Sequence, residues 1–205
     1  MKERIKHLIL VILLVVLDQG SKFWVRTELI NQDKIDIIPK VLNLQYSINT
    51  GAVWGILSGK VDFLKIVSLI ILVVITFAYF KIPNVKKYNV LKTLVVFIIA
   101  GAMGNLIDRF YLGYVVDFIY FEIINFPLFN LADTYLTVAS ILLFILAMFY
   151  YKDEDFEFLN YIFKKKKAST GEINSSEDII LDASDEYEKE AEDKEINSNA
   201  SEDES

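Results

Sequence analysis

Four long apolar stretches, separated by polar loops, dominate the pattern of this chain. They lie at residues 8–25, 63–80, 93–107 and 131–151, although the first is free of polar residues only over 8–17. A helix of 18 residues rises about 27 Å, which matches the hydrocarbon core of a bilayer. We therefore predict an all-α membrane protein with four transmembrane helices.

The loop between the first two predicted helices has a second type of pattern. Residues 35–48 alternate in part between apolar and polar positions and are rich in β-branched side chains, which predicts one or two short strands. Next, Asn49 or Thr50 could cap a short helix that lies in the headgroup layer. The apolar residues of this expected interfacial helix are Val53, Trp54, Ile56 and Leu57.

The loop at 110–129 is almost wholly aromatic and β-branched. Such a composition is typical of the aromatic belt at a membrane surface. The residues expected in this belt are Tyr111, Tyr114, Phe118, Tyr120 and Phe121. A belt does not explain why Asp117 lies among them.

Composition supports the membrane class and divides the chain in two. Hydrophobic residues make up 54% of the chain and its mean hydropathy is +0.37, which is high for a soluble domain. The net charge of −7 combines +5 over residues 1–167 with −12 over 168–205. We predict a membrane domain at 1–163, then a basic run and a disordered acidic cytoplasmic tail at 164–205. The tail either only solvates the chain or binds a basic cytoplasmic partner.

The residue inventory excludes several kinds of chemistry. The chain has no cysteine, so thiol nucleophiles, thiolate metal sites and disulfides are excluded. It has one histidine, His7, which argues against a zinc hydrolase. We expect neither a metal nor an organic cofactor.

Basic residues are distributed unequally between the two sides of the predicted membrane domain. The side of both termini holds twelve and the other side five, so the positive-inside rule places both termini in the cytoplasm. The start of the chain is also similar to a signal peptide, with Lys2, Arg4 and Lys6 before the apolar run. No small-residue cleavage site follows that run, which favours an uncleaved membrane anchor.

Asp117 and Asp133 are the most informative polar residues. Each lies in a strongly apolar stretch, where a carboxylate costs several kcal/mol and indicates a functional site. Two carboxylates that share one proton can activate water and protonate a substrate, as in aspartic proteases. Alternatively, Asp133 only stabilises the positive N-terminus of its helix.

Other polar residues lie towards the same outer face. Asn105 and Arg109 share a helix face near the outer end of the third span, and Asn130 stands three residues before Asp133. Asp108, beside Arg109, fits equally well an ordinary surface or capping group or a member of this polar cluster. The small residues of 100–104 favour close helix packing. Asp18 and Lys22, at i and i+4, form an expected ion pair that supports either the structure or the site.

Five segments together resemble the successive motif blocks of bacterial lipoprotein signal peptidase, also called signal peptidase II. They are Asp18-Gln19-Gly20-Ser21-Lys22, Asn49-Thr50-Gly51-Ala52, Gly101-Ala102-Met103-Gly104-Asn105-Leu106-Ile107-Asp108-Arg109, Val115-Val116-Asp117-Phe118 and Phe129-Asn130-Leu131-Ala132-Asp133. The resemblance extends over about residues 5–155, in family order and spacing.

This resemblance implies an aspartyl endopeptidase of the bacterial inner membrane. Its substrates would be prolipoproteins whose lipobox cysteine already carries a diacylglyceryl group, and the cut would fall just before that cysteine. Asp117 and Asp133 would be the catalytic dyad. The residues that would bind substrate or position the dyad are Asn49, Gly51, Asn105, Arg109 and Asn130. The implied fold adds a small extracytoplasmic β-cradle and an interfacial helix to the four spans.

We also expect a monomer that contacts membrane lipids and binds no nucleic acid. The positive-inside pattern places its active site near the outer face. Two other classes of protein remain as alternatives. A small proton- or ion-coupled transporter would show repeats, broken helices and charges near the midplane. A non-catalytic membrane scaffold would leave the paired aspartates unexplained.

Overall fold

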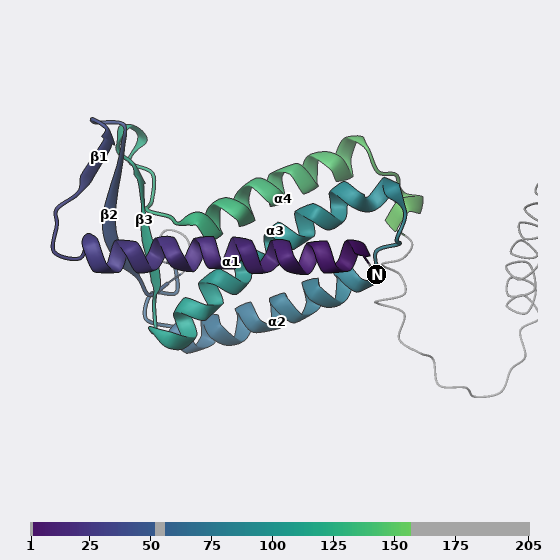
Figure 1. Cartoon of the computed structure of the whole chain (residues 1–205), viewed down its shortest axis with the longest axis horizontal. Helices are drawn as coiled ribbons and strands as arrows, with labels where there is room; N and C mark the ends of the chain where they lie inside the picture. The colour runs from purple at the N-terminus through teal and green to yellow at the C-terminus, as the bar shows by residue number, and fades with distance from the viewer. Residues whose placement is uncertain (1, 52–55, 157–205) are drawn as a thin grey trace, which may run out of the picture. The chain divides into compact units, whose positions relative to one another are not determined.

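The computed structural model describes residues 2–51 and 56–156 (Figure 1). Its helices are α1 (Lys2–Glu28), α2 (Val61–Lys81), α3 (Asn89–Tyr111) and α4 (Leu131–Phe149), and its strands are β1 (Ile35–Ile38), β2 (Leu42–Asn49) and β3 (Val115–Phe121). Short 3-10 turns lie at Lys86–Tyr88, Glu122–Ile124 and Asp153–Phe156. The predicted tail at 164–205 lies outside the described residues.

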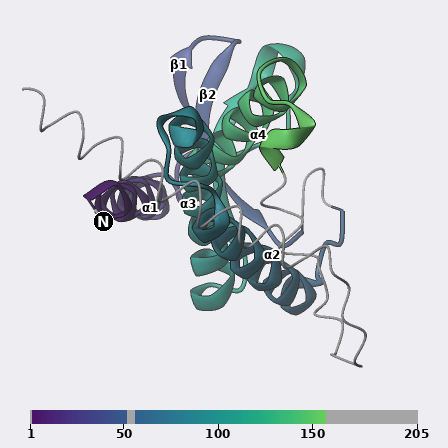
Figure 2. The ribbon, with the colours of Figure 1, turned by 90° about the vertical axis from the view of Figure 1, so that its right-hand side faces the viewer.

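Among the described residues, four helices are long and apolar enough to cross a membrane, which confirms the predicted spans. Helix α3 packs against α1, α2 and α4 and lies between them when the bundle is viewed along its length (Figure 2). Many large apolar side chains on α1, α2 and α4 are exposed, as lipid-facing positions require. Helices α1 and α3 begin earlier and end later than the apolar runs, because polar residues continue each helix beyond the hydrocarbon core.

A small antiparallel sheet lies at the end of the bundle away from the N-terminus (Figure 1). The strand order is β1-β2-β3, and β2 pairs with β3 from Leu42↔Phe121 to Asn49↔Val115. The register shifts between Leu44 and Ser47. The sequence predicted one or two short strands within 35–48, and the structure has two, β1 and β2. Strand β3 adds a third that the aromatic pattern of 110–129 did not predict.

The aromatic-belt interpretation is wrong for Phe118. Its side chain is only 5% exposed and belongs to a core with Val25, Leu29 and Val116. Strand β3 is buried at four successive residues, 115–118, so its inner positions pack on α1 while Tyr111, before the strand, stays 85% exposed. A fully buried strand has no alternating pattern, which explains why it resembled a membrane-surface segment.

The predicted interfacial helix falls mostly on residues 52–55, which lie outside the described part of the chain. Its last two residues, Ile56 and Leu57, belong to a turn and are exposed. The backbone N–H of Gly59 donates to the carbonyl of Thr50 (3.2 Å) and so joins the two ends of this segment.

Candidate active site

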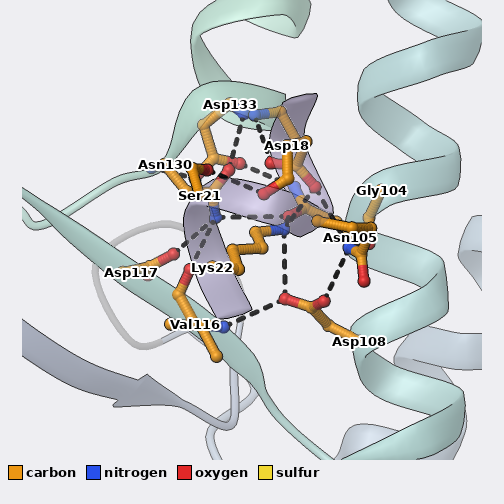
Figure 3. A network of polar contacts seen from close by, with 12 residues as sticks. Asp18, Ser21, Lys22, Gly104, Asn105, Asp108, Val116, Asp117, Asn130 and Asp133 are labelled. Carbon is orange, nitrogen blue, oxygen red and sulfur yellow. Dashed lines mark hydrogen bonds and ion pairs between the residues drawn. The ribbon is translucent and has the colours of Figure 1, made fainter. Parts of the chain in front are cut away.

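Asp117 and Asp133 come from different elements and meet at Asn130. Asp117 lies in the middle of β3, and Asp133 lies in the first turn of α4 (Figure 3). The side-chain amide of Asn130 donates to Asp117 Oδ1 (2.7 Å), and its backbone N–H donates to Asp133 Oδ2 (3.3 Å). One buried asparagine therefore holds both carboxylates.

Asp117 is buried, with 3% of its surface exposed. Its second oxygen accepts a hydrogen bond from Asn49 Nδ2 (2.8 Å). Burial, together with the negative charge of Asp133, raises the pKa of Asp117 from 3.8 to about 7, although the hydrogen bonds from Asn49 and Asn130 oppose the rise. The carboxyl group can therefore hold a proton near neutral pH.

Asp133 both stabilises the start of α4 and contacts the asparagines around Asp117. It is the third residue of α4 and forms a capping box with Asn130, whose Oδ1 accepts from the Asp133 backbone N–H (2.9 Å). Its Oδ1 also accepts from Asn105 Nδ2 (2.7 Å). The capping interaction orients the carboxylate towards the same cluster that holds Asp117.

The remaining residues of the predicted site surround this pair. Arg109 donates from Nη2 to the carbonyl of Gly51 (3.3 Å) and from Nη1 to the carbonyl of Asn105 (3.4 Å). Asn49 Oδ1 accepts from the backbone N–H of Gly51 (2.9 Å), which makes a tight turn after β2. The structure thus brings all five predicted positioning residues to the two aspartates, with Arg109 bonded to backbone carbonyls.

Beside the pair, Lys22 lies at the centre of a buried cluster of charges (Figure 3). Its Nζ forms ion pairs with Asp18 Oδ2 (2.9 Å) and Asp108 Oδ2 (3.0 Å) and donates to Asn105 Oδ1 (3.0 Å). The expected ion pair between Asp18 and Lys22 is therefore present. The interpretation of Asp108 as a surface or capping group is wrong, because its side chain is 2% exposed and points into the bundle from α3.

Gln19 was not singled out from the sequence, although it stands within the first motif block. Its Nε2 lies within hydrogen-bonding distance of Asp18 Oδ2 (3.1 Å), Asp108 Oδ1 (2.9 Å) and the carbonyl of Gly104 (3.1 Å). Its position directly after Asp18 was the only local signal. Among the described residues, no three His, Cys, Asp or Glu side chains are grouped to hold a metal ion.

Comparisons with known proteins agree with this geometry. The family profile described as signal peptidase (SPase) II matches residues 10–149. The chain belongs to the signal peptidase II family. A lipoprotein signal peptidase of Enterococcus faecalis (strain ATCC 700802 / V583) is 43% identical over 133 residues, which are 65% of this chain and 81% of the relative. A lipoprotein signal peptidase of Staphylococcus aureus (strain JH9) is 39% identical over 140 residues, 67% of this chain and 85% of the relative.

Two solved structures of a bacterial membrane enzyme, determined by the in meso method, share the fold. Both align with a TM-score of 0.61, at 32% and 38% identity. They cover 82% and 72% of this chain, and 94% of each solved chain is aligned. The resemblance drawn from the motif blocks is confirmed, and membership of the signal peptidase II family replaces the transporter and scaffold alternatives.

Proposed function

We propose that this protein is an aspartic endopeptidase in which Asp117 and Asp133 are the catalytic dyad. Removal of the signal peptide from prolipoproteins is the activity of the signal peptidase II family, and the chain is a multi-pass protein of the bacterial inner membrane. The proposal adds the class of peptidase, the residues that react and the lipid-modified form of the substrate.

The observation that carries this proposal is the shared contact through Asn130. Two carboxyl groups from distant elements are held by the side chain and backbone of one residue that is fully buried. The pKa of Asp117, about 7, supports a pair that keeps one proton near neutral pH. Such a pair titrates as a unit, so its proton belongs to both aspartates.

In the proposed reaction, the ionised carboxylate takes a proton from a water molecule whose oxygen attacks the scissile carbonyl carbon. The protonated carboxyl group donates its proton to the carbonyl oxygen, which gives a tetrahedral gem-diol. When this intermediate collapses, the aspartate that took the proton from water donates it to the amide nitrogen, and the other aspartate takes a proton from a gem-diol hydroxyl. The C–N bond then breaks and releases an amine and a carboxylic acid. Each cycle returns the pair to its single proton.

The remaining polar residues support the orientation of the dyad and of the peptide. The amides of Asn49, Asn105 and Asn130 each donate to a catalytic oxygen, which limits rotation of both carboxylates. Arg109 holds the Gly51 carbonyl, so Gly51 is tied to α3 beside the dyad. We propose that Gly51 borders the bound substrate.

The substrate we propose carries a diacylglyceryl group on the cysteine that follows the cut. Its acyl chains can stay in the bilayer only if the scissile bond reaches water at a membrane surface. The dyad lies where the helices meet the sheet, at the end of the bundle away from the N-terminus (Figure 1). Together with the positive-inside pattern, this location supports cytoplasmic termini and an active site near the outer face.

Cleavage by purified full-length protein tests this function. The substrate is a prolipoprotein with a diacylglyceryl-modified cysteine, and the variants are Asp117→Asn and Asp133→Asn. Each should lower kcat at least about a thousandfold. Asp62→Asn is the matched control, because Asp62 lies in the first turn of α2 and its side chain is 92% exposed.

Wild-type rates in both dyad variants would show that the aspartates are not the catalysts. If wild-type protein fails to cut where the Staphylococcus aureus relative does, the proposed substrate is wrong. A cut at another bond would also contradict the proposed substrate. Folding of each variant is checked by size-exclusion chromatography and thermal unfolding in the same detergent.

A further inference from the structure

The residue before each catalytic aspartate is bonded to the same buried cluster. The backbone N–H of Val116, which precedes Asp117, donates to Asp108 Oδ2 (3.1 Å). The backbone N–H of Ala132, which precedes Asp133, donates to Asp18 Oδ1 (3.0 Å). The backbone N–H group of the residue before each catalytic aspartate therefore donates a hydrogen bond to a buried carboxylate.

Lys22 and Gln19 join these two carboxylates to each other. Lys22 Nζ is paired with both of them, at 2.9 and 3.0 Å, and Gln19 Nε2 lies within hydrogen-bonding distance of both, at 3.1 and 2.9 Å. Both donors come from α1, whereas Asp108 comes from α3. As a result, β3 and α4 are fixed to one point through charged hydrogen bonds.

A third connection reaches the dyad through Asn105. Its Oδ1 accepts from Lys22 Nζ (3.0 Å), and this contact leaves its Nδ2 to donate to Asp133 Oδ1 (2.7 Å). A lysine ammonium can only donate, so it fixes which end of the amide faces it. Lys22 thereby determines that Asn105 presents an N–H, and not an oxygen, to Asp133.

We propose that Asp108, Asp18, Lys22 and Gln19 form a positioning brace that sets the separation and orientation of the two catalytic carboxylates. The brace touches neither carboxylate of the dyad directly, and it acts through the peptide N–H before each aspartate and through Asn105. The inference rests on the proposed catalytic role of Asp117 and Asp133. It gives Asp108 a role that its sequence position did not indicate.

The chemistry of the cluster exceeds what helix packing alone requires. One lysine pairs with two buried aspartates, and buried charged groups are an expensive way to hold helices together. Their hydrogen bonds, by contrast, have fixed directions and hold β3 and the first turn of α4 in place. A displacement of about 1 Å at a reacting group lowers the rate about a hundredfold, so this rigidity affects catalysis.

Steady-state cleavage with the diacylglyceryl-modified prolipoprotein tests the brace in the full-length protein. Asp108→Leu removes the acceptor for Val116, whereas Asp108→Asn keeps one oxygen for it. We expect Asp108→Leu to lower kcat about 10- to 100-fold with KM changed less than about twofold, and Asp108→Asn to recover part of that loss.

Lys22→Met provides a second, electrostatic measurement. The charged groups that act on Asp117 are Asp133 of α4, Lys22 of α1 and Arg109 of α3, while Lys22 itself faces Asp18 and Asp108. The positive charge of Lys22 lowers the pKa of Asp117, so its removal should raise that pKa. Activity that needs the shared proton should then persist to higher pH, and the alkaline side of the pH profile should move upwards. A merely structural lysine would change the yield of folded protein without this shift.

Lys92→Met is the matched control. Lys92 is also a lysine buried in the helical bundle (5% exposed), but its Nζ donates to Asn84 Oδ1 (2.9 Å) near the start of α3, and no ion pair with a carboxylate is found for it within the described residues. We expect Lys92→Met to keep the wild-type kcat and pH profile. The comparison separates loss of a buried lysine from loss of the brace.

The brace is refuted if Lys22→Met and Asp108→Leu keep the wild-type kcat and pH profile while Asp117→Asn is inactive. It is also refuted if their loss of activity equals their loss of folded protein. An active Asp117→Asn would instead refute the proposed function itself. A lowered kcat at constant KM, with recovery in Asp108→Asn, supports the brace.

Discussion

At the scale of the residue, Asn130 connects the proposed catalytic dyad to the start of helix α4. Its side-chain amide lies within hydrogen-bonding distance of Asp117 Oδ1, Asn105 Oδ1 and the carbonyl of Val116, and its side-chain oxygen caps α4 at Asp133. The residue is fully buried, so neither end of the amide can exchange its partner for water. An asparagine is suited to this position because it both donates and accepts.

Asn130→Ala is therefore expected to lower kcat about a hundredfold and to lower the free energy of unfolding by about 1 kcal/mol through loss of the cap. Cleavage rates and thermal unfolding in detergent measure the two effects. Asn84→Ala is a fitting control, because the Asn84 side chain also accepts a hydrogen bond, in its case from Lys92, but lies outside the site. Equal losses in both variants would contradict the role of Asn130.

The pKa of Asp117 leads to a prediction about pH. A proton that is held up to about pH 7 is lost above it, so kcat/KM should fall as the pH rises through 7. A profile that stays flat to pH 9 would contradict a shared proton on this pair. Asp62→Asn, with its change on the exposed surface, should leave the profile unaltered.

The same shift predicts how stability depends on pH. The folded pKa of Asp117 lies above its usual 3.8, so the folded state binds the proton more tightly, and stability falls as the pH rises from about 4 to about 7. Asp117→Asn removes this loss. At pH 8 the variant should therefore have a higher thermal midpoint than the wild type. The gain in the free energy of unfolding should be no more than about 4 kcal/mol and should shrink towards pH 4.

At the scale of the element, two glycines let α3 approach its neighbours at the site. A Cβ on Gly101 would lie 2.5 Å from the carbonyl oxygen of Ala132, and one on Gly104 would overlap the Asp18 carboxylate. The small residues that predicted helix packing are thus located where α3 meets α1 and α4. Close approach is what allows Asp18 to reach the first turn of α4.

Gly104→Ala should destabilise the protein by about 1–3 kcal/mol and abolish most activity, because the brace cannot move away from the new methyl group. Gly20→Ala is a matched control within α1, since nothing lies within 4 Å of its added Cβ. There, alanine should be neutral or stabilise the helix by up to about 1 kcal/mol. Similar thermal midpoints for the two variants would contradict this packing.

At the scale of the whole membrane unit, the two ends of the bundle differ in structure and charge. The sheet and the dyad lie at one end, and the N-terminus, the α2–α3 connection and the end of α4 lie at the other (Figure 1). The basic residues concentrate on the second end, which supports an outward-facing active site.

The absence of cysteine allows a direct test of this orientation. In intact cells, a membrane-impermeant maleimide should label Asp33→Cys before β1. It should label Lys86→Cys, between α2 and α3, only after the membrane is permeabilised, because both positions are exposed but lie at opposite ends. The reverse pattern would invert the topology. The unmodified chain, which has no cysteine, is the negative control for labelling.

The sequence by itself determined the membrane class, the four spans, the presence of strand structure within 35–48 and the motif blocks that contain the proposed dyad. These features depend on local pattern: an apolar run long enough to cross a bilayer, alternation in 35–48, and carboxylates in apolar surroundings. Each of these signals is contained within one short stretch of the sequence. They therefore need no knowledge of which segments meet.

Only the tertiary structure decided the third strand, the burial of Phe118 and the cluster around Lys22. Asp18 is bonded to a peptide N–H 114 residues away, and Lys22 to an amide 83 residues away, so no local pattern reveals either contact. Asp108 resembles a surface charge in the sequence, and only the packing of α1 against α3 shows that it pairs with Lys22. The partner of a buried polar group is set by how the helices pack, and the sequence lists the groups without pairing them.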